Sequence, residues 1–186
     1  MGSDSVTSIS CIMGIIYKKC SMIFELPYNT IFVNYMNVTH VLTKNGLSIE
    51  STSQLVPWSA IRERLLHRED LCEPVCDVLC DIADANPSLV IEHITGFHYT
   101  ERQLFSMMYE RILCSPVHEK MGLLRLMYIL AQRPDVRNYI VDLDMVPLTI
   151  HLADICIMYP NLLTHASDII RVFSVTEGIR SVVIEA

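Results

Sequence analysis

The chain has 186 residues, of which 51% are hydrophobic and only 19% are charged, whereas an ordinary domain carries roughly a quarter charged residues. This composition excludes an intrinsically disordered chain, and the length is enough to bury a sizeable core. The formal net charge of −7 disfavours nucleic acid and anionic membranes as partners, because both attract positive protein surfaces. A protein segment with basic and apolar residues is the electrostatically easier partner.

The first predicted helix covers residues 5–24, with Ser5 as its cap and a proline after its end. Its apolar stretch at 9–24 raises the question of a membrane span. Two lysines, Lys18 and Lys19, interrupt that stretch, and it falls short of the roughly 20 residues that a span needs. We therefore expect a buried helix. A second helix is predicted over 28–43, where the β-branched residues leave a strand as the alternative.

The middle of the chain is predicted to contain a linker and two helices. Residues 47–54 are typical of a linker, and a Val-Pro step then opens a helix from 56 to 67. Another helix is expected over 71–85, with Asp70 as its cap. It ends at Asn86-Pro87, and a short apolar element of undefined type follows at 89–94.

The second half of the chain is predicted to be helical as well. Thr100 and Gln103 have the spacing of a capping box, which predicts a helix over 100–113. Further helices and short apolar elements then alternate to the end of the sequence. The predicted helices are 116–132, 146–158 and one from 161 or 164 to 178, and the short apolar elements are 139–141 and 179–184.

Seven cysteines predict an intracellular protein, cytoplasmic or nuclear, with reduced thiols. Their number is odd, their spacing is irregular, and the sequence shows no secretory signal. Cys72, Cys76 and Cys80 would share one helix face. They would span about 12 Å along that helix, which is too far for a single metal ion to bind all three. We therefore expect thiols packed between helices and no metal site.

Parts of the chain look like copies of one unit. The helix ends at 82–83, 130–131 and 173–174 are each followed within about a dozen residues by an apolar pair and then an acidic residue. A Val-Pro step opens a helix at both 56–57 and 146–147. The period is in the forties, which is the length of the armadillo and HEAT types of helical repeat.

The order of elements in 140–152, 161–175 and 180–186 resembles the armadillo-repeat family. This resemblance implies an all-α fold, a right-handed α-solenoid of about three to four repeats in a single domain over 1–186. The repeats would cover 5–46 as a degenerate copy, then 55–94, 97–142 and 145–186. The glycines that the family usually carries before its proline step are missing. The Trp and Asn ladder of nuclear-import adaptors is replaced by Asp81, Tyr128 and Arg171, which disfavours that role.

The resemblance implies a non-enzymatic scaffold that binds a partner peptide or helix in a groove lined by the long third helices. The sequence shows no recognisable catalytic motif and no Gly-rich phosphate loop, so we expect neither an enzyme nor a cofactor. An acidic strip at Asp77, Asp81 and Asp84 would pair with basic ligand residues, or alternatively form an ordinary solvated face. The predicted partner-binding residues are Asp77, Asp81, Arg125, Tyr128, Asp168 and Arg171.

One alternative architecture remains at this point. A compact helical bundle of the death-regulator type would hold an amphipathic helix in an apolar groove, and it would need no recurring Val-Pro step. In either architecture, the excess of apolar residues predicts that another chain covers part of the surface. That chain would be a partner protein or a second copy, as in a homo-oligomer.

Overall fold

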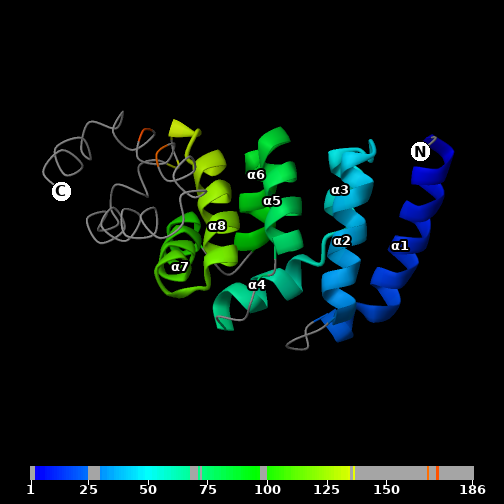
Figure 1. The fold of residues 1–186 in the computed structure, drawn as a ribbon, viewed down its shortest axis with the longest axis horizontal. Coiled ribbons are helices and arrows are strands. Elements are labelled where there is room, and N and C mark those ends of the chain that lie inside the picture. The colour runs from blue at the N-terminus through cyan, green and yellow to red at the C-terminus, as the bar shows by residue number, and fades with distance from the viewer. Residues whose placement is uncertain are drawn as a thin grey trace, which may run out of the picture. The chain divides into compact units, whose positions relative to one another are not determined.

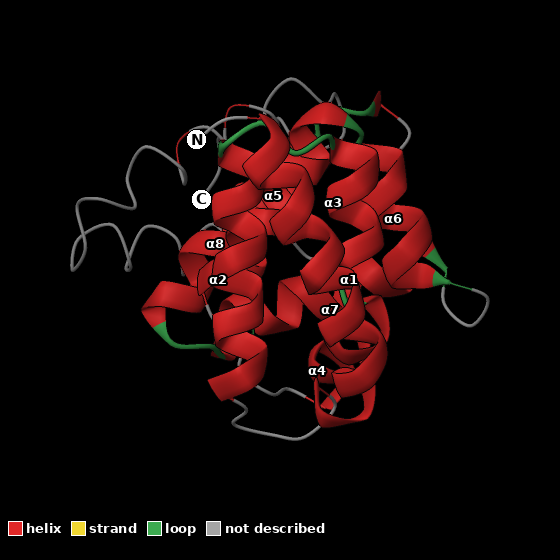
Figure 2. Ribbon diagram, turned by 90° about the vertical axis from the view of Figure 1, so that its right-hand side faces the viewer, coloured by secondary structure: helices red, strands yellow, loops and turns green. Residues whose placement is uncertain are grey.

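The computed structural model describes residues 3–24, 30–67, 71, 73–96, 100–134, 136, 167 and 171. Within these ranges the backbone forms eight helices and no strand (Figures 1 and 2). The predicted all-α class is therefore confirmed. The chain divides into two compact units, Met1–Gly96 and Phe97–Ala186, and each unit is considered by itself.

The first unit begins with two long helices, α1 (Ser3–Phe24) and α2 (Thr30–Lys44), which confirm the two predicted helices and remove the strand alternative. They contact one another and run in opposite directions (Figure 1). Each buries one face, as an amphipathic helix does. The buried residues are Val6, Met13 and Phe24 on α1, and Phe32, Tyr35, Met36, Thr39 and Leu42 on α2.

Aromatic rings fill the contact between α1 and α2. The ring centroids of Phe24 and Tyr35 lie 4.8 Å apart, and those of Phe24 and Phe32 lie 6.1 Å apart. Arg64, from α4 (Trp58–His67), places its guanidinium carbon 4.4 Å from the centroid of the Phe32 ring. The same guanidinium donates a hydrogen bond of 3.3 Å to the Phe24 carbonyl oxygen. Arg64 is therefore held by a cation–π contact and by a helix-terminal carbonyl.

The prediction of a linker at 47–54 is wrong, because most of this segment belongs to the helix α3 (Ile49–Leu55). Gly46 lies in the turn that follows α2 and has a φ of 97°, which suits glycine, and the Leu47 amide bonds back to the Leu42 carbonyl at 3.0 Å. Ser48 then caps α3 by accepting a hydrogen bond from the Ser51 amide at 3.2 Å. Tyr35 donates its hydroxyl to the Leu55 carbonyl at 2.8 Å, which ties the end of α3 to α2.

Two further helices, α5 (Glu73–Ala85) and α6 (Pro87–Thr95), complete the first unit. α5 lies against α2 and α6, and its predicted apolar stripe is buried, together with the thiols of Cys76 and Cys80. Asn86 caps α6 by accepting a hydrogen bond from the Leu89 amide at 3.3 Å, so the apolar element at 89–94 is helical. The stripe consists of Val75, Val78, Leu79 and Ile82.

The second unit contains α7 (Glu101–Cys114) and α8 (Val117–Leu130), which pack against each other. The predicted capping box of Thr100 and Gln103 is confirmed. Arg111 and Glu119 form a buried ion pair between the two helices, with Nε 3.0 Å from the carboxylate. The core residues of this pair of helices are Leu104, Phe105, Met108 and Ile112 on α7, and Leu123, Leu124, Met127 and Leu130 on α8.

Several predictions fall outside the described residues. These are the Asp70 cap, the apolar element at 139–141, and most of the chain from 146 to 184. The solenoid handedness and the repeat type therefore stay predictions. Among the helices that the structure describes, none is long and apolar enough to cross a membrane, including the one that holds the apolar stretch at 9–24.

We predict that Tyr35→Phe lowers the free energy of unfolding by about 1–2 kcal/mol at neutral pH, because the Leu55 carbonyl loses its buried donor. Burial, reinforced by the neighbouring Tyr17, raises the pKa of Tyr35 above its usual range. Above a pH of about 10 the unfolded chain releases this proton while the folded protein keeps it, so wild-type stability falls as pH rises.

Tyr35→Phe has no hydroxyl at this position, so its free energy of unfolding does not fall for this reason as pH rises. The free energies of unfolding of the variant and the wild type should therefore converge above a pH of about 10. Urea unfolding at a series of pH values measures both free energies. Curves that stay parallel through this range would contradict the buried, neutral state of the Tyr35 hydroxyl.

Candidate functional site

An open pocket with a cavity volume of about 480 Å³ lies between α3 and α6. This volume is within the range that ligand-binding clefts in proteins usually have. One wall comes from α3, and the other comes from the end of α5 and from α6. The lining residues are Ile49, Glu50, Ser53 and Gln54 on the first wall, and Ala85, Asn86, Leu89 and His93 on the second.

The two walls are held together by Trp58, the single tryptophan of the chain. Its ring stacks on the His93 ring, with the centroids 4.6 Å apart and an angle of 9° between the planes. Its indole N–H donates to the Ser53 carbonyl at 2.9 Å. Trp58 thus contacts one lining residue on each wall, so the pocket is part of the folded framework of the unit.

Arg62 fixes the end of α6 beside the pocket. Its guanidinium donates to the carbonyl oxygens of His93 and Ile94, at 2.8 and 3.0 Å. A Cβ on Gly96 would lie only 3.0 Å from this guanidinium, and the φ of Gly96 is 54°. A glycine is therefore needed here, both for the backbone conformation and for the approach of Arg62.

The chemistry of the pocket is mixed. Ile49 and Leu89 are half-buried and offer apolar surface, while Gln54 and Asn86 expose amide groups. Glu50 lies in the first turn of α3 and is exposed, and no Lys or Arg occurs among the eight residues that line the pocket. This arrangement can hold a ligand that presents an apolar group next to a cationic one.

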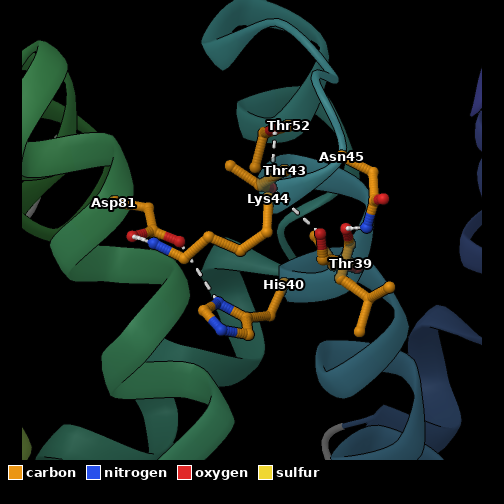
Figure 3. Close-up of polar contacts among 8 residues, drawn as sticks. Thr39, His40, Thr43, Lys44, Asn45, Thr52 and Asp81 are labelled. Atoms are coloured by element: carbon orange, nitrogen blue, oxygen red, sulfur yellow. Dashed lines mark hydrogen bonds and ion pairs between the residues drawn. The ribbon is translucent and has the colours of Figure 1, made fainter. Parts of the chain in front are cut away.

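A second polar cluster joins α2 to α5 (Figure 3). The Lys44 ammonium lies 2.7 Å from one oxygen of the Asp81 carboxylate, and the His40 Nδ1 lies 3.1 Å from the other. The His40 contact lacks hydrogen-bond geometry. His40 Nδ1 and Asp81 Oδ2 are therefore both buried without a hydrogen bond. Only 8% of the Asp81 side chain is exposed, whereas 56% of Lys44 is. The Asp81 carboxylate is therefore engaged mainly by side chains of α2 and little by solvent.

Threonines on α2 and α3 extend this cluster (Figure 3). The hydroxyl of Thr43 lies 3.1 Å from that of Thr52, and it can donate to the Thr39 carbonyl at 2.9 Å. Thr39 in turn donates to the Tyr35 carbonyl at 3.0 Å. Buried hydroxyl groups on α2 and α3 thus have hydrogen-bond partners, as buried polar groups require.

The six predicted partner-binding residues are placed as follows. Asp77 is half-buried on α5, and the carboxylate of Asp81 on the same helix is engaged by α2. Arg125 and Tyr128 are half-buried on α8 of the second unit, and Arg171 is exposed. Asp168 lies outside the described residues. That the six residues share one groove stays a prediction, and none of them lines the pocket.

The α3 wall of the pocket is missed by sequence reasoning, because the polar stretch at 47–54 predicts a linker. A local signal was present. Ser48 is a good N-cap residue, and Glu50 follows it as an acidic residue in the first turn, where it favours a helix N-terminus. The polar composition of the segment outweighed that signal. Within the described residues, no group of three or more His, Cys, Asp or Glu side chains could hold a metal ion.

Comparison with known proteins gives no relative: no family model, no curated protein and no solved structure matches the chain. The resemblance to the armadillo-repeat family therefore stays a prediction from the sequence pattern.

We predict that Asp81→Asn lowers the free energy of unfolding by about 1–2 kcal/mol, because a largely buried carboxylate loses its charge-assisted contact with Lys44. The exposure of Lys44 limits the loss, since water screens that end of the pair. Asp84→Asn on the same helix is the matched control. Asp84 is exposed, so the expected change there is within about 0.5 kcal/mol. Equal losses for the two variants in urea unfolding would contradict a structural role for Asp81.

Proposed function

We propose that this protein is a non-enzymatic interaction module that binds a short segment of a partner protein in the pocket between α3 and α6. The observation that carries the proposal is the lining of that pocket. An exposed carboxylate, two exposed amides and two aliphatic side chains surround it, and none of its eight lining residues is Lys or Arg. The fitting ligand is a segment with a basic residue near an apolar one.

Each part of such a segment has a place in the pocket. An apolar side chain between Ile49 and Leu89 would leave water, which contributes most of the affinity. A Lys or Arg side chain would pair with Glu50, and this pairing selects basic segments over acidic ones. The amides of Gln54 and Asn86 offer hydrogen bonds to an extended main chain. The net charge of −7 adds attraction for a basic ligand at longer range.

The wider architecture belongs to the same proposal. A right-handed α-solenoid of armadillo-like repeats displays surfaces for extended peptides, and this binding mode agrees with the polar amides of the pocket. The alternative, a death-regulator type of bundle, would bind an amphipathic helix. Such a helix requires a continuous apolar groove for several side chains spaced along it. The amides and the carboxylate in the lining favour the extended segment.

An intracellular location, cytoplasmic or nuclear, completes the proposal. In the described part of the chain, Cys11 and Cys114 are free thiols on the surface. Free surface thiols are typical of a reducing compartment. The partner would then be another intracellular protein.

Selection from a library of random peptides tests this function with the full chain as bait. We expect enriched peptides to carry Lys or Arg next to a branched aliphatic residue, and to change the fluorescence of Trp58, which stacks on the lining residue His93. Glu50→Lys should weaken these peptides about tenfold or more, because a charge-assisted contact becomes a repulsion. Fluorescence titration measures the dissociation constants.

Glu73→Lys is the matched control, with the same change of charge at an exposed position of α5. It lies twelve residues before Ala85, about 18 Å along the helix, so only the long-range attraction should decrease. Equal weakening by the two variants would show a general charge effect and contradict the proposed site. Failure to enrich basic and apolar peptides would contradict the proposed ligand.

A further inference from the structure

The exposed side of α1 carries a stripe of four residues, Ser8, Ile12, Ile15 and Lys19, here called the α1 stripe. Their spacing of four, three and four residues places them along one line of the helix. Ile12 and Ile15 are 56% and 57% exposed, more than any other large hydrophobic residue that the structure describes. α1 thus has apolar residues on the side that meets the rest of the unit and also on the side that faces solvent.

The α1 stripe is complementary to itself. Its four positions are symmetric about the point between residues 13 and 14. A second α1 in antiparallel orientation about that point would place Ile12 against Ile15 of the second copy, and Ile15 against Ile12. Ser8 and Lys19 would then face one another on both sides, so that each hydroxyl can accept a hydrogen bond from an ammonium group. A two-fold interface requires this kind of self-matching surface.

Charge selects the antiparallel arrangement over the parallel one. In a parallel pair, Lys19 would face Lys19 of the second copy, and like charges repel. In the antiparallel pair, the two Lys19 positions are eleven residues apart along the helix axis, about 16 Å. That distance exceeds the Debye length of about 8–10 Å in ordinary buffers, so the repulsion is largely screened.

The exposed apolar residues of α2 form a less suitable surface. Ile31, Val38 and Val41 are also exposed, but exposed Asn34 and Asn37 lie between them. Burying these amides against a second chain would require new hydrogen-bond partners for each of them. The α1 stripe has no such requirement between its two isoleucines.

We propose that two copies of this chain associate through the α1 stripe, with their α1 helices antiparallel. The interface of one helix per copy is small, so the dimer is weak and forms as the concentration rises. The net charge of −7 on each copy opposes association further. The α1 stripe shares no residue with the pocket between α3 and α6, so this proposal is independent of the proposed function.

Sedimentation of the full chain over a range of concentrations, up to about 200 µM, tests the proposal. The wild type should shift from monomer to dimer. Ile15→Glu should raise the dimer dissociation constant about tenfold or more, because it places a charge in the apolar centre. Ile31→Glu makes the same change on α2 at a residue that is 50% exposed, and it should leave the dissociation constant unchanged. Circular dichroism checks that both variants keep their helical content.

A third variant, Ser8→Glu, tests the orientation. In the antiparallel dimer the new carboxylate faces Lys19 of the second copy, so the dissociation constant should fall a few-fold, about what an exposed ion pair provides. In a parallel dimer two carboxylates would face each other, and the constant would rise. A monomer at every concentration, an equal loss for Ile31→Glu, or weaker association of Ser8→Glu would each overturn the proposal.

Discussion

The hydrogen bond from the Tyr35 hydroxyl to the Leu55 carbonyl anchors α3, and with it one wall of the pocket, to the rest of the first unit. It joins the middle of α2 to the end of α3, a helix of seven residues that would be unstable alone. The same tyrosine ring packs against Phe24 from α1. One side chain therefore links three helices, and it holds the α3 wall against the aromatic core.

The carboxylates of the first unit fall into two classes. Asp81 is largely buried, and its contacts with Lys44 and His40 hold α2 and α5 together (Figure 3). Glu50 is exposed at the start of α3, where it lines a pocket and favours the helix N-terminus. A buried, paired carboxylate contributes to the fold, whereas an exposed one beside apolar walls is available to a ligand. For this reason we assign ligand binding to Glu50 and a structural role to Asp81.

Local chemistry made most helix boundaries predictable from sequence. The Thr100–Gln103 box and the Asn86-Pro87 step mark helix starts with residues that satisfy free backbone amides. The helix at 49–55 was missed because its buried polar residues depend on tertiary contacts, such as that of Thr52 with Thr43. The pocket was missed with it. The Lys44–Asp81 contact spans 37 residues of sequence, and no local pattern reveals such a pairing.

Binding of a basic and apolar segment in the pocket between α3 and α6 would shield the backbone of both walls. Amide hydrogen exchange of the full chain, with and without a saturating peptide chosen by library selection, measures this shielding. We expect slower exchange in residues 49–54 and 86–93 on binding, with the amides of α7 and α8 unchanged. Protection confined to α7 and α8, with none in 49–54 and 86–93, would contradict binding in this pocket.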